Sequence, residues 1–167
     1  MTRFVVALVA LAALAMGPTA AVEADASVSQ PTFVVDVRGV PMSCTSFAGE
    51  PVAIILNEQL GDVGMASRNA WGVPVIEINP LVTNRHSDIV TQWWFAHECA
   101  HHALHPLMNN ETNADCFAVD QLVALGLLDT VDELGSFRRE LSHLPGSAHG
   151  HLPGPARVTN IEMCAMF

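Results

Sequence analysis

The chain has 167 residues, half of them hydrophobic, with 7 basic and 17 acidic side chains and a formal net charge of −10. This hydrophobic content excludes an intrinsically disordered chain. The negative charge argues against nucleic acid and anionic membrane surfaces as partners.

The first 24 residues have the pattern of a secretion signal. Arg3 supplies a positive start, and Phe4–Met16 is an uninterrupted apolar run that small residues follow. Because this run is short for a bilayer span, we expect cleavage and no stable membrane insertion afterwards, with an uncleaved anchor as the alternative. Residues 25–167 then form a single exported domain, periplasmic or secreted.

Two strands and a connecting loop are expected at the start of this domain. Thr32–Val37 and Val52–Leu56 have strand-like composition, and Gly39–Gly49 is expected to be loop. Gly72–Asn79 is predicted to be a third strand. Pro74 favours a position at the sheet edge, because proline removes a hydrogen-bond donor from a central ladder.

Four helices are expected in the C-terminal half, each marked by a residue that favours a helix start. These residues are Ser87 for a helix over 88–104, Asn109 or Asn110 for one to about 128, Thr130 with Glu133 for one to about 144, and Pro155 for one toward 164. The first helix is apolar nearly all round, so it should be central, and Pro106 ends it. The fold class is therefore α+β, with a small mixed sheet packed on a helical bundle.

The central helix carries His97-Glu98-Cys99-Ala100-His101, an HExxH motif. Residues four apart project from one face of a helix, so the two imidazoles can bind one zinc ion while Glu98 lies beside them as a general base. The alternative is a core helix that happens to carry histidines.

A catalytic zinc needs a third protein ligand and an open position. His102 lies about 140° around the helix from His97, and His105 lies about 12 Å along the axis from it, so neither fits. Glu111 is preferred, because it begins the next helix after a short turn. Asp115, one turn later, can accept a hydrogen bond from a ligating imidazole. The alternative for this pair is a solvated helix face.

HExxH followed by Asn110-Glu111-Thr112-Asn113-Ala114-Asp115 resembles the gluzincin metallopeptidases, particularly the short peptidases related to HtpX and the CAAX prenyl proteases. The resemblance covers roughly Gly72–Cys164. It implies a zincin-like fold, Zn²⁺ as cofactor, and two histidines and a glutamate as ligands. The family's membrane helices are missing, so a membrane-protein substrate is not implied.

His151 and Arg157 have the same interval as a histidine and an arginine near the C-terminus of that family. By resemblance, both are catalytic residues at the cleft, where they would steady the oxyanion or a ligand carboxylate. His149 competes with His151 for this assignment. The alternative for His151 is an exposed loop histidine.

Cys44, Cys99, Cys116 and Cys164 form an even set that suits disulfides in an oxidising compartment. Three pairings are possible. A bond between Cys44 and Cys164 is preferred, because it would close a long loop. Cys99 points away from the metal face, and Cys116 pairs with it or stays reduced.

These features predict an exported zinc metalloendopeptidase that acts on protein or peptide substrates, which could add a strand beside Gly72–Asn79. One alternative is a catalytically inactive periplasmic zinc-binding or chaperone-like module with a zincin fold. The others are a metal-free interaction domain held by disulfides, and a peptidase whose loop at Pro145–Gly154 covers the cleft. The sequence names neither the substrate nor the oligomeric state.

Overall fold

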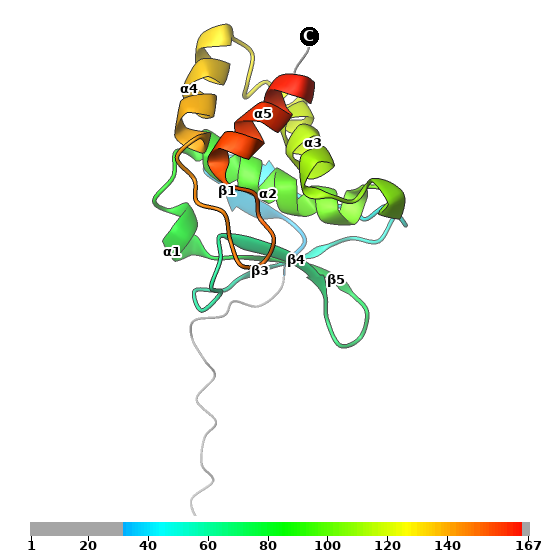
Figure 1. The fold of residues 1–167 in the computed structure, drawn as a ribbon. Helices are drawn as coiled ribbons and strands as arrows, with labels where there is room; N and C mark the ends of the chain where they lie inside the picture. The colour runs from blue at the N-terminus through cyan, green and yellow to red at the C-terminus, as the bar shows by residue number, and fades with distance from the viewer. Residues whose placement is uncertain (1–31, 165–167) are drawn as a thin grey trace, which may run out of the picture.

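The structure is a computed structural model that describes residues 32–164, so the predicted signal peptide lies outside the described residues. It has a mixed α+β architecture, in which small sheets lie on one side of a helical bundle (Figure 1). This confirms the predicted α+β class. Within the described range, no helix combines the length and the apolar character that a membrane span requires.

An antiparallel hairpin joins β1 (Val35–Val37) to β2 (Val40–Met42). Its two turn residues, Arg38 and Gly39, have φ values of 56° and 82°. Positive φ at both central positions is the geometry of a tight hairpin turn, and glycine adopts it without strain. The prediction of loop over Gly39–Gly49 was therefore wrong for its first part, because β2 is too short to show an alternating pattern.

The second sheet has three strands in the order β3 (Ala53–Leu56), β5 (Pro74–Ile78), β4 (Gly64–Arg68). β3 runs parallel to β5, and β4 runs antiparallel to it. The edge position predicted from Pro74 was wrong, since β5 is the central strand. Pro74 is the first residue of β5, where a missing N–H is tolerated.

The helices are α1 (Pro80–Thr83), α2 (Asp88–Ala103), a 3₁₀ turn η1 (Pro106–Met108), α3 (Glu111–Ala124), α4 (Val131–Leu141) and α5 (Gly154–Cys164). The predicted caps are confirmed: Ser87, Asn110 and Thr130 each accept a backbone N–H, and Glu133 completes a capping box. Every residue of α2 from Val90 to Ala100 is buried, so α2 is the central helix between the sheet and the other helices (Figure 1).

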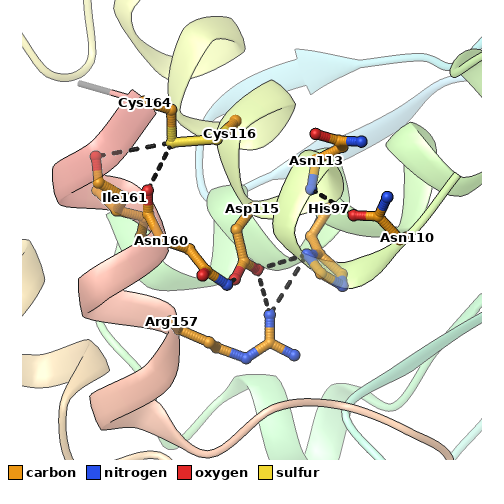
Figure 2. The surroundings of a disulfide bond; sticks show 9 residues. All are labelled: His97, Asn110, Asn113, Asp115, Cys116, Arg157, Asn160, Ile161 and Cys164. Atoms are coloured by element: carbon orange, nitrogen blue, oxygen red, sulfur yellow. Dashed lines mark hydrogen bonds and ion pairs between the residues drawn. A yellow bond between two sulfur atoms is a disulfide. The ribbon is translucent and has the colours of Figure 1, made fainter. Parts of the chain in front are cut away.

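Two disulfides are present, and they correct the preferred pairing of Cys44 with Cys164. Cys44 bonds Cys99, and Cys116 bonds Cys164. The first bond joins the segment after β2 to α2. The second joins α3 to α5 (Figure 2). Both bonds fit a domain from an oxidising compartment.

Candidate metal centre

Three side chains from α2 and α3 meet at one point. His97 and His101 project from the same face of α2, and their Nε2 atoms lie 3.3 Å apart. The turn through η1 brings Glu111 back over this face, with Oε2 at 3.4 Å from His97 Nε2 and Oε1 at 3.2 Å from His101 Nε2. Two ligands about 2.1 Å from one tetrahedral ion lie about 3.4 Å apart. The separation of the two Nε2 atoms matches this value, and each faces one Glu111 oxygen at a similar distance, so the three side chains fit a single small cation.

Asn109 fixes the position of His101. Its Oδ1 lies 2.8 Å from His101 Nδ1, and its Nδ2 donates to the His101 carbonyl at 2.9 Å. This leaves Nε2 of His101 free to face Glu111. Sequence reasoning considered Asn109 only as a helix cap. Asn109 lies in the short turn between the HExxH motif and Glu111, and this position was the signal that it could contact His101.

Asp115 lies behind His97 and is fully buried. Its Oδ1 is 3.0 Å from His97 Nδ1 (Figure 2). This contact orients the imidazole, whose Nε2 faces Glu111 at 3.4 Å. Asn160 of α5 donates to the other carboxylate oxygen at 3.0 Å. Asn160 was missed. It lies on one face of α5 with Arg157 and Cys164, at helical spacings of three and four.

Arg157 is fully buried and does not line the cleft. Its guanidinium bonds Asp115 and lies 3.3 Å from Glu111 Oε2. Its carbon Cζ also lies 5.1 Å and 4.7 Å from the ring centroids of Trp93 and Trp94. Of the two roles expected for Arg157, this position suits steadying a ligand carboxylate and does not allow contact with a substrate oxyanion.

Glu98 and His151 face each other at the cleft. Glu98 is 1% exposed, and its Oε1 lies 3.1 Å from His151 Nε2. His151 is buried, so the alternative of an exposed loop histidine is wrong, whereas His149 is exposed. Gly64 at the start of β4 packs against Glu98: a Cβ at this position would meet Glu98 Cγ at 2.8 Å. Gly64 therefore makes room for the Glu98 side chain.

The cleft has a volume of about 240 Å³. Glu98, His101 and Glu111 line it from the helices, β4 lines it along one side, and His149 and His151 line it from the loop before α5. His102 also lines the cleft, although its Nε2 is held 3.0 Å from the Val75 carbonyl. His105 lies at the start of η1 and stacks edge-on against Phe47.

The site concentrates negative charge. Burial opposes ionisation of Glu111, yet hydrogen bonds from His101 and His97 hold its pKa well below the usual range. Burial also opposes protonation of His101, but the bond to Glu111 raises the pKa of His101 above its ordinary value. A proton on His101 thus compensates the Glu111 carboxylate where a cation could do so.

A second combination of residues could also hold a metal ion. His97, Glu111 and His151 offer ligand atoms within 4.8 Å of one another. Both ring nitrogens of His151 face carboxylates at 3.1 Å, however, so ligation by His151 would require it to leave one of them. His101 is already within 3.4 Å of both other ligands, and we take it as the third member of the set.

Comparisons with protein-family models, with curated proteins and with solved structures found no match to this chain. The function is therefore inferred from the geometry of the site.

Proposed function

We propose that this protein is an exported zinc-dependent peptidase. The observation that carries the proposal is the convergence of His97, His101 and Glu111: the two Nε2 atoms lie 3.3 Å apart, and each faces one Glu111 oxygen at 3.2–3.4 Å. Glu98 lies in the cleft that His101 and Glu111 also line. Three protein ligands and one open position are the arrangement of catalytic zinc sites. Two imidazoles disfavour calcium and magnesium, which prefer oxygen ligands.

A zinc ion in this site would supply Lewis acidity, which polarises a carbonyl and lowers the pKa of water. The remaining chemistry belongs to the side chains. Glu98 accepts the proton of the attacking water at Oε1 or Oε2 and donates it to the leaving amine. His151 Nε2 faces the cleft beside Glu98, where it donates a hydrogen bond to the developing oxyanion.

Arg157 and Asp115 act from behind the ligands. Arg157 pairs with Glu111 and Asp115, so it holds the ligand carboxylate in place while Asp115 holds the His97 ring. Neither residue touches substrate in this mechanism.

We infer that an extended substrate binds along β4. This strand lines the cleft and pairs only with β5 among the described strands, so its other edge is available for strand addition. The proposal replaces binding beside Gly72–Asn79, because β5 in that segment is flanked on both sides.

The test is a comparison of the wild type with Glu98→Gln, with Glu58→Ala on the exposed β3–β4 connection as control. Metal content is measured together with hydrolysis of an unfolded casein-type substrate. We expect all three proteins to bind one zinc ion and only Glu98→Gln to lose cleavage. A wild type that binds zinc but leaves unfolded proteins and peptides intact would favour the inactive metal-binding module instead.

A further inference from the structure

Asp62 is a buried carboxylate outside the HExxH and ExxAD motifs. It lies in the connection between β3 and β4, yet its side chain is only 8% exposed. Its Oδ1 accepts the Val63 N–H at 2.7 Å. Its Oδ2 lies 3.1 Å from Nδ1 of His151, and neither atom makes a well-aligned hydrogen bond, either with the other or with any other group in the described chain.

A buried carboxylate without a partner is costly, so this contact has to compensate the burial of Asp62. His151 in turn lies between two acids, with Nδ1 toward Asp62 and Nε2 toward Glu98, both at 3.1 Å. An imidazole ring that is held at one nitrogen has the direction of its other nitrogen fixed. Asp62 therefore determines which atom of His151 faces the cleft.

The loop that carries His151 lacks regular structure, and a backbone bond from the Ser147 N–H to the His151 carbonyl at 3.0 Å restrains the main chain but not the ring. The ring packs on Trp94 with 5.0 Å between centroids, which limits its tilt but does not select a nitrogen. The polar contact that holds Nδ1, and so leaves Nε2 to face the cleft, comes from Asp62.

We propose that Asp62 is a positioning residue for His151. Asp62 accepts a hydrogen bond from Nδ1–H of the protonated ring, so that Nε2–H of the same imidazolium is presented to the oxyanion that forms next to Glu98. This inference rests on the proposed peptidase function. The same arrangement, a buried acid that orients a catalytic imidazole, underlies catalytic triads on unrelated folds.

The kinetic test uses zinc-loaded protein and an unfolded casein-type substrate. Asp62→Ala should lower kcat by about 10- to 100-fold, the usual effect of removing an orienting partner, and leave KM within about twofold. Asp62→Asn keeps the size of the side chain but removes its charge and can turn an amide N–H toward Nδ1, so it should stay slow as well. Glu58→Ala, in the same connection, is the control.

The double variant Asp62→Ala with His151→Ala separates positioning from a general effect on stability. If Asp62 acts through His151, the double variant is no slower than His151→Ala alone. The proposal would be overturned if Asp62→Ala lowered kcat by the same factor in the His151→Ala background as in the wild type, because Asp62 would then act independently of the ring.

A second readout does not depend on activity. In the zinc-loaded wild type, ¹⁵N-resolved NMR of the histidine side chains should show a slowly exchanging His151 Nδ1 proton that disappears in Asp62→Ala. If the wild type is inert but this proton behaves as described, the peptidase function fails and the positioning of the ring by Asp62 stands. If the proton is unchanged in both Asp62→Ala and Asp62→Asn, the positioning role is wrong.

Discussion

Replacing Asp115 by alanine should both destabilise the fold and weaken metal binding. Asp115 is fully buried and contacts three groups: the His97 ring, the Arg157 guanidinium and the Asn160 amide. Removing one partner of a buried ion pair costs about 3–5 kcal/mol, since the remaining charge is left uncompensated. Glu111 stays 3.3 Å from Arg157, so we expect the lower end, about 3 kcal/mol.

The loss should appear as a lower urea midpoint with an unchanged slope, measured in the presence of a chelator so that metal does not contribute. Zinc affinity, measured by competition with a chromogenic chelator, should fall by about 10- to 100-fold because the His97 ring is no longer oriented. Asp120→Ala on the exposed side of α3 is the control and should change stability by less than about 0.5 kcal/mol. If Asp115→Ala unfolds at the wild-type midpoint and binds zinc equally tightly, the inferred network is wrong.

Gly64→Ala should retain metal but lose most activity, because the new Cβ meets the Cγ atom of Glu98, the proposed general base, at 2.8 Å. Gly61→Ala has open space around its Cβ and should behave as wild type. Equal activities of the two variants would refute the packing argument. Zinc affinity should fall by about tenfold per pH unit below the raised pKa of His101, since this ring must lose its proton to bind metal, and a flat profile in chelator competition between pH 5 and 8 would contradict this. For the same reason the metal-free protein gains stability from the His101 pair below about pH 6.5, and this gain is lost as the pH rises through the raised pKa. The double replacement Cys116→Ser with Cys164→Ser opens a loop with a sequence separation of 48 and should lower the unfolding free energy by about 4 kcal/mol in urea titrations, while a change below 1 kcal/mol would show that α5 docks without the bond.

Local signals predicted the helical part of the fold. Ser87, Asn110 and the capping box at Thr130 satisfy helix ends with residues a few positions away, so their effect is visible in the sequence. The spacing of His97 and His101 likewise determines a shared face of α2, since both lie on one regular helix.

Features that depend on distant parts of the chain were not predictable in the same way. β4 has the sequence Gly-Met-Ala-Ser-Arg, which lacks branched residues, and it forms a strand because β5 supplies a partner. The disulfide partners are 55 and 48 residues apart, and no spacing rule distinguishes the possible pairings.

The same limit applies within the site. His97, His101 and Glu111 belong to two helices joined by a short turn, so sequence spacing was enough to bring them together. Asp62 and Asn160 reach the site from separate elements, and only the tertiary packing of α5 and of the β3–β4 connection reveals their contacts.

The central claim is that one zinc ion is held by His97, His101 and Glu111. The most direct test is zinc content with X-ray absorption spectra of the purified protein, repeated for His101→Ala, Glu111→Ala and His151→Ala. We predict one zinc ion per chain with two imidazole ligands and no sulfur, loss of zinc in the first two variants, and retention in His151→Ala. A wild type without zinc, or a site that survives Glu111→Ala but is lost in His151→Ala, would contradict the account.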